Sequence, residues 1–150
     1  MTTQEIAHRL ALKELVDTFS NLADEKNVSA QIPLFTADAH INVVMDGKEV
    51  FDLNGQQQIL EAFSGYLAQF SVVYHINGQQ TLEIHGDSAK GTSYCQVVLI
   101  KQENGQRIKQ TSGVRYHDRY VFNNGKWLIA ERKSDFMWTD IEPMQTATNV

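Results

Sequence analysis

The chain has 150 residues, a length typical of one domain, and a net charge of −5 at pH 7. Its lysines and arginines are scattered rather than clustered, so no broad cationic surface is available to bind nucleic-acid phosphates. The longest apolar runs, such as Val97 to Ile100, fall far short of the roughly 20 residues that cross a bilayer, and the N-terminus lacks the apolar run of a signal peptide. We therefore expect one cytoplasmic domain over residues 1–150 that binds neither nucleic acid nor membrane.

The residue types that commonly hold metals and cofactors are dispersed along the sequence. Cys95 is the single cysteine, which excludes an internal disulfide and a cysteine-based zinc site. The remaining candidate ligands are histidines on separate predicted strands, without a short ligand spacing: His40, His75, His85 and His117. Glycine-rich phosphate loops and nucleophile elbows are missing as well. We expect neither a metal nor a cofactor.

The first third of the chain is predicted to be helical. Thr2 and Glu5 have the spacing of a capping box, and apolar residues then recur at helical intervals, which predicts a helix from Thr3 to Glu25. A short second helix is predicted over Val28 to Phe35, where Pro33 removes a backbone donor and distorts it.

A β-hairpin and a third helix are predicted next. Alternating apolar residues over Ala39 to Met45, a turn at Asp46-Gly47 and a partner strand over Glu49 to Leu53 form the hairpin. Asn54 is the expected cap of a helix that ends near Phe70.

The second half of the chain contains long predicted strands separated by turn residues. They run over Val72 to His85, Ser88 to Gln102, Gln106 to Phe122 and Lys126 to Trp138. Helices followed by hairpin-linked strands indicate an α+β fold with an antiparallel sheet, one face of which the helices cover. The tail after about Pro143 is expected to be mobile.

Several short segments occur in the order and spacing of a known family. They are Leu22 to Asp24, Leu34 to Ala39, Tyr74 to Asn77, Gly86 to Ala89, Gly113 to Tyr120 and Gly125 to Ile129. The sequence resembles the SnoaL-like family of the nuclear-transport-factor-like superfamily over nearly its whole length. The resemblance implies a cone-shaped α+β barrel, with N-terminal helices packed on a strongly curved antiparallel sheet around a pocket. It also implies dimers or trimers, and we expect a homodimer first and a trimer next.

Asp24 and His75 are the candidate catalytic residues. Asp24 lies at the predicted end of the first helix, where the helix dipole and partial burial favour proton uptake by its carboxylate. Composition alone favours a solvated helix-end acid, whereas dehydratases of the family that it resembles carry an aspartate at this point. His75 matches a pocket-facing histidine of the same relatives and could transfer protons, although it could also be a hydrogen-bonded structural residue.

Four further residues are expected to contact a substrate: Phe19, Asn77, Tyr116 and Asp118. Asn77 shares a strand face with His75 by period-two alternation. Tyr116 and Asp118 share a face of their own strand; the resemblance favours that face inward, and a bulge would swap the faces. Phe19 stands where the dehydratases tend to have a tyrosine, so a phenolic donor is missing there.

The resemblance therefore implies a lyase or isomerase, dehydratase-like or cyclase-like. In this hypothesis Asp24 removes a proton next to a carbonyl, and His75 assists proton transfer on a small apolar ring compound in a closed pocket. The alternative is a noncatalytic ligand-binding or assembly domain of the same fold, which the absent tyrosine favours.

Overall fold

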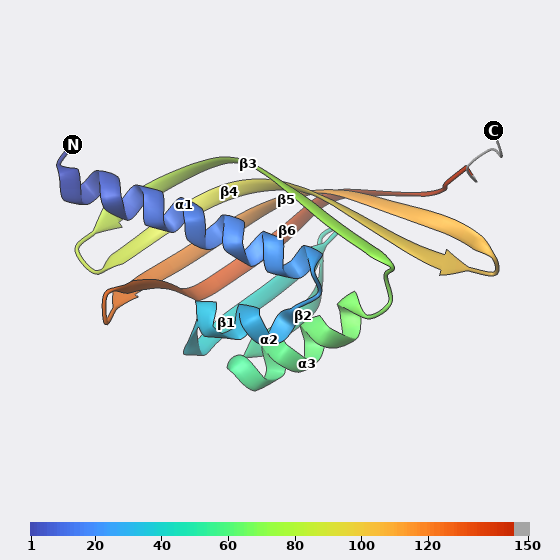
Figure 1. Ribbon diagram of the computed structural model, residues 1–150, viewed down its shortest axis with the longest axis horizontal. Helices are drawn as coiled ribbons and strands as arrows, with labels where there is room; N and C mark the ends of the chain where they lie inside the picture. The colour runs from blue at the N-terminus through green and yellow to red at the C-terminus, as the bar shows by residue number, and fades with distance from the viewer. Residues whose placement is uncertain (146–150) are drawn as a thin grey trace.

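The computed structural model describes residues 1–145 as three helices, one short 3₁₀ segment and six strands (Figure 1). The helices are α1 (Thr3–Asp24), α2 (Val28–Gln31) and α3 (Gln56–Leu67), and the 3₁₀ segment is η1 (Ile32–Leu34). The strands are β1 (Phe35–Met45), β2 (Lys48–Asn54), β3 (Val72–His85), β4 (Ser88–Glu103), β5 (Gln106–Asn123) and β6 (Lys126–Pro143). None of the helices in this part of the chain is long and apolar enough to cross a membrane.

All six strands form one sheet in the order β2-β1-β6-β5-β4-β3. Neighbouring strands are antiparallel except β1 and β6, which pair in parallel from His40↔Glu131 to Met45↔Phe136. The sheet was expected to be antiparallel throughout, and the parallel pairing of β1 with β6 corrects this expectation. Hairpin turns impose antiparallel order only on strands that follow one another, and β1 and β6 are separated by most of the chain.

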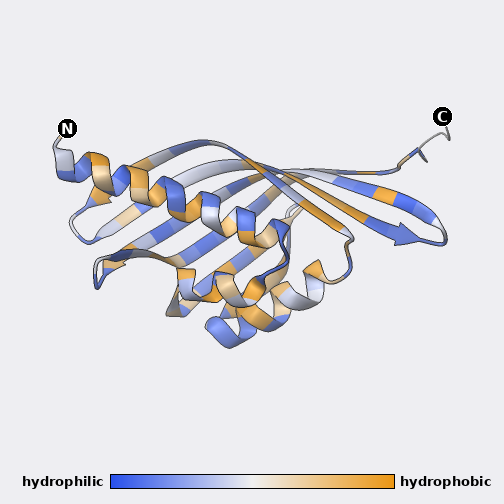
Figure 2. Ribbon diagram, viewed as in Figure 1, coloured by the Kyte–Doolittle hydropathy of each residue, from blue (hydrophilic) through white to orange (hydrophobic). Residues whose placement is uncertain are grey.

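The sheet is strongly curved, and the helices lie on its concave side, which confirms the cone-shaped α+β fold (Figure 1). α1 crosses the sheet against β3 and β6, α3 lies beside β1 and β2, and α2 contacts α1 and α3. Apolar and polar residues alternate along the strands (Figure 2). This alternation lets one face of the sheet pack on the helices while the other faces solvent.

Two local features differ from the sequence predictions. The second helix is α-helical only over α2 and continues as η1, which contains Pro33, so that β1 begins at Phe35. Gly55, with φ of 86°, is the N-cap of α3 in place of Asn54, whose backbone N–H instead donates to the Gln58 side chain. Met144 donates to the Arg107 carbonyl just past Pro143, and residues 146–150 of the predicted mobile tail lie outside the described residues.

Candidate active site

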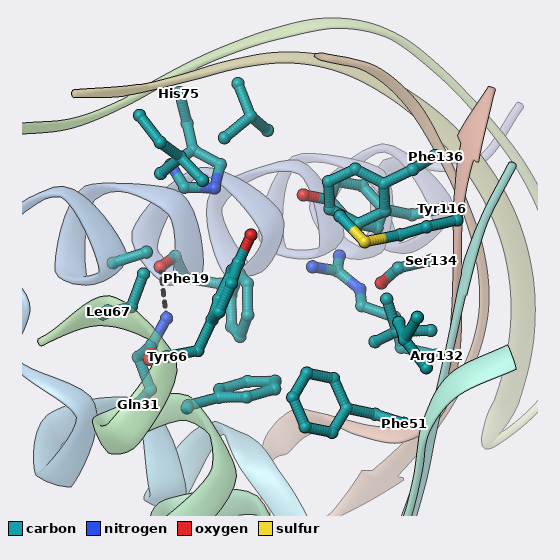
Figure 3. A pocket seen from close by; sticks show the side chains of 17 residues that line it. Phe19, Gln31, Phe51, Tyr66, Leu67, His75, Tyr116, Arg132, Ser134 and Phe136 are labelled. Carbon is teal, nitrogen blue, oxygen red and sulfur yellow. Dashed lines mark hydrogen bonds between the residues drawn. The ribbon is translucent and has the colours of Figure 1, made fainter. Parts of the chain in front are cut away.

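A cavity of about 350 Å³ lies between the helices and the concave side of the sheet (Figure 3). This volume is in the range of small-molecule sites, roughly 300–1,000 Å³. Most of the lining is aliphatic or aromatic, including Val43, Phe51, Phe63, Leu67, Val97 and Leu99. The polar side chains in the lining are Gln31, Tyr66, His75, Tyr116, Arg132 and Ser134. A mainly apolar cavity with a few polar groups can both hold a ring compound and orient it.

His75 and Asp24 form a hydrogen-bonded pair between β3 and the last residue of α1. The ring Nδ1 of His75 lies 2.7 Å from Oδ1 of Asp24, and the backbone N–H of His75 donates to Oδ2 at 3.2 Å. The His75 side chain is 9% exposed and lines the cavity, whereas Asp24 is 27% exposed and does not. The structure therefore brings the two candidate catalytic residues together, with the imidazole in the cavity lining (Figure 3) and the carboxylate outside that lining.

Asn77 lies on the same face of β3 as His75, but it contacts α1 and not the cavity. Its amide nitrogen donates to Oδ1 of Asp17 at 2.9 Å, and its amide oxygen accepts from the Ser20 hydroxyl at 3.1 Å. Asn77 is not among the residues that line the cavity, and its expected contact with a substrate stays a prediction. Its side chain fastens α1 to β3 one step along the strand from the His75–Asp24 pair.

Tyr116 and Asp118 both point to the inner face of β5, as the resemblance implied. Tyr116 lines the cavity, and burial raises the pKa of its phenol, which therefore stays protonated and able to donate. Asp118 lies outside the cavity lining, with its carboxylate fully buried. It accepts from Nε of Arg132 at 2.8 Å, from Nη2 of Arg132 at 2.9 Å and from the Tyr120 hydroxyl at 2.6 Å. Asp118 thus holds Arg132 in place, and its expected contact with a substrate stays a prediction.

Arg132 is the functional candidate that the sequence analysis missed. Its side chain is 1% exposed and lines the cavity, and its guanidinium carbon lies 3.9 Å from the Tyr116 ring centre and 4.6 Å from the Phe19 ring centre. Burial opposes the charge, but the adjacent carboxylate of Asp118 outweighs it and raises the pKa of Arg132 further above its usual range. Nη1 is buried and has no hydrogen-bond partner within residues 1–145. The cavity therefore has a fixed positive charge with one spare donor group.

Comparison with known proteins identifies the family. The family model described as "SnoaL-like domain" matches residues 4–133. The chain belongs to the SnoaL-like family. An uncharacterized protein of Mycobacterium tuberculosis is 25% identical to this SnoaL-like chain over 133 residues, which are 88% of this chain and 87% of that protein.

Two solved structures share the fold of this SnoaL-like chain. A candidate scytalone dehydratase from Novosphingobium aromaticivorans superposes with a TM-score of 0.84 at 17% identity, over 98% of this chain and 95% of that one. A hexachlorocyclohexane dehydrochlorinase, LinA-type3, from Novosphingobium barchaimii has a TM-score of 0.77 at 17% identity, over 97% and 96% of the two chains. At these identities the likeness demonstrates a common fold, and the fold alone does not assign an activity.

Proposed function

We propose that this SnoaL-like protein is a cofactor-independent lyase or isomerase that moves protons on a small apolar ring compound bound in the cavity. The observation that carries the proposal is the His75–Asp24 pair, 2.7 Å apart, with the imidazole lining a largely apolar cavity. A histidine held by a carboxylate is a common arrangement for a general base. The similar structures that bear dehydratase and dehydrochlorinase names agree with elimination chemistry.

In this proposal His75 is the base and Asp24 positions it, which reverses the roles expected from sequence. Nδ1–H donates to Asp24, and this hydrogen bond fixes the tautomer in which the lone pair is on Nε2. Nε2 takes a proton from a carbon next to a carbonyl or a leaving group. The Asp24 carboxylate stabilises the imidazolium that forms. Both oxygens of Asp24 already accept from His75, so Asp24 itself is poorly placed to receive a substrate proton.

In this proposal Arg132 and Tyr116 stabilise the negative charge that forms when the proton is removed. As the C–H electrons move toward the carbonyl oxygen or the leaving group, negative charge develops there, and the Arg132 charge and the Tyr116 hydroxyl stabilise it. The imidazolium can then return its proton to another carbon, which gives isomerisation, or to a departing hydroxyl, which gives elimination of water. Phe19 packs on the Arg132 guanidinium, and Tyr116 provides the phenolic donor that Phe19 lacks.

Hydrogen–deuterium exchange of a model ketone tests the proposed removal of a proton next to a carbonyl without knowledge of the natural substrate. The probe is 1-tetralone, an apolar two-ring ketone, and NMR follows loss of its α-protons in D₂O. We expect the wild-type protein to accelerate exchange and His75→Gln to lose that acceleration, because glutamine keeps a polar side chain but is not a base. If 1-tetralone binds the cavity and both proteins exchange it at the buffer rate, the noncatalytic binding function is correct instead.

A further inference from the structure

Gln31 is a buried polar residue in the cavity lining that the proposed proton transfer does not use. It is 0% exposed and lies on α2, on the opposite side of the cavity from β6 (Figure 3). Its amide nitrogen donates to the backbone carbonyl of Phe19 at 3.0 Å. Its amide oxygen, Oε1, is buried and accepts no hydrogen bond from any group in residues 1–145.

The hydrogen bond to Phe19 fixes which end of the Gln31 amide is available. Rotating the amide by half a turn would place Oε1 against the Phe19 carbonyl oxygen, so that two acceptors would meet. Gln31 is one of the residues that line the mostly apolar cavity, so its Oε1 is an acceptor held close to the cavity without a partner in residues 1–145. Burying a hydrogen-bond acceptor without a donor costs free energy, and a ligand that brings a donor to it recovers that free energy.

We infer that Gln31 is a specificity-determining residue whose Oε1 accepts a hydrogen bond from a hydroxyl group on the ring compound. The inference rests on the proposed function only in placing that compound in the cavity. Arg132 Nη1 donates and Gln31 Oε1 accepts, so the two residues select different groups of one ligand. The substrate class is thus narrowed from an apolar ring compound to a hydroxylated one.

Two matched probes measure this selection. 2-Naphthol can donate from its hydroxyl, whereas 2-methoxynaphthalene keeps the ring system and the acceptor oxygen but has no donor. Isothermal titration calorimetry gives the dissociation constant of each probe for the wild type, Gln31→Met and Gln31→Glu. The quantity of interest is the ratio of the two constants within one protein, because a general disturbance of the fold affects both probes and largely cancels.

We expect the wild type to prefer 2-naphthol and Gln31→Met to lose roughly three- to tenfold of that preference, the usual net value of one neutral hydrogen bond. As a neutral acid, the Gln31→Glu side chain can donate its O–H to the Phe19 carbonyl and keep its other oxygen as an acceptor, so this variant should keep the preference. Ser93→Ala is the matched control, because the Ser93 hydroxyl is also buried without a partner within residues 1–145 but does not line the cavity. Its preference should equal that of the wild type.

An unchanged preference in Gln31→Met would overturn the inference and leave Gln31 as an anchor between α2 and α1. Failure of 2-naphthol to bind the wild type, or to bind it better than the methyl ether, would overturn it as well. These outcomes are separate from failure of the proposed function, because they are read from binding alone and the exchange of 1-tetralone is read from turnover.

Discussion

The carboxylate of Asp118 engages the guanidinium of Arg132 with both oxygens, and both side chains are buried beneath the cavity. Breaking such a pair from one side leaves an uncompensated buried charge, which typically costs about 3–5 kcal/mol. We expect Asp118→Asn to lower the free energy of unfolding by about this amount, as measured by urea denaturation.

The double variant Asp118→Leu/Arg132→Met provides the control for this prediction. It removes both charges and keeps much of the volume, so it should be more stable than Asp118→Asn. It should nevertheless fail to accelerate exchange of 1-tetralone, because no positive charge remains in the cavity. If the losses in free energy of unfolding at the two positions were strictly additive, this result would contradict the coupling of Asp118 and Arg132.

Replacement of Asp24 separates catalysis from folding. Asp24→Asn keeps the size of the side chain but removes the charge that stabilises the His75 imidazolium, so we expect turnover to fall on the order of a hundredfold. The free energy of unfolding should change by about 1 kcal/mol or less, because Asp24 is 27% exposed. Proton exchange of 1-tetralone and thermal denaturation measure the two effects.

Asp17→Asn is the matched control for Asp24→Asn. Asp17 is also an acid on α1 that contacts β3, through Asn77, but it does not line the cavity or contact His75. Its replacement should leave turnover near the wild-type value. Full activity of Asp24→Asn would contradict the role of the His75–Asp24 pair.

Cys95 predicts a loss of stability at alkaline pH. Burial raises the pKa of its thiol from 9.0 to about 11. The folded protein therefore keeps the proton between these values while the unfolded chain releases it, so the free energy of unfolding falls as pH rises through this interval. The loss is up to roughly 3 kcal/mol. Urea denaturation at pH 8 to 11 should show a shallower decline in Cys95→Ala, and equal slopes would refute this contribution.

The convex face of the sheet is expected to join two copies of the chain. His75 and Asn77 face α1, so Tyr74 and Ile76 face the other way, and each is 51% exposed. Trp138 is 50% exposed and shares a shallow groove with Ile76 on this face. Multi-angle light scattering should give a dimer mass, with a trimer as the next expectation, and Ile76→Lys should shift it toward a monomer. A wild-type monomer at micromolar concentration would contradict this prediction.

Elements of the fold could be predicted from the sequence where the residues that determine them lie close together in the chain. The Thr2 cap and the Asp46-Gly47 turn act within a few residues, so they placed α1 and the first hairpin correctly. The parallel pairing of β1 with β6 depends on residues about a hundred positions apart and leaves no local mark. The α3 cap was assigned to Asn54 because its side chain can cap a helix, whereas the backbone turns at Gly55.

The site was only partly predictable for a similar reason. Strict alternation from Trp127 and Ile129 would place Glu131 inward and Arg132 outward, and Glu131-Arg132-Lys133 has the composition of a solvated strand. The pairing shifts by one residue at Ala130, because Tyr120 pairs with Ile129 while Arg119 pairs with Glu131. This bulge turns Arg132 inward. A buried partner for Asp118 was the available clue, since a buried carboxylate needs a cation.

The place of β6 in the sheet has a consequence for biosynthesis. β6 is the last strand of the sheet to be synthesised, yet it lies between β1 and β5 and bridges the two halves. The β1–β2 hairpin and the β3–β4–β5 meander can each form without β6. β1 and β5, however, each lack a neighbouring strand on one side until β6 follows. Val43 on β1 and Val97 on β4, which both line the cavity, are therefore brought together last. Until β6 pairs with β1 and β5, both of these strands have an unpaired edge, and such edges favour association with other chains.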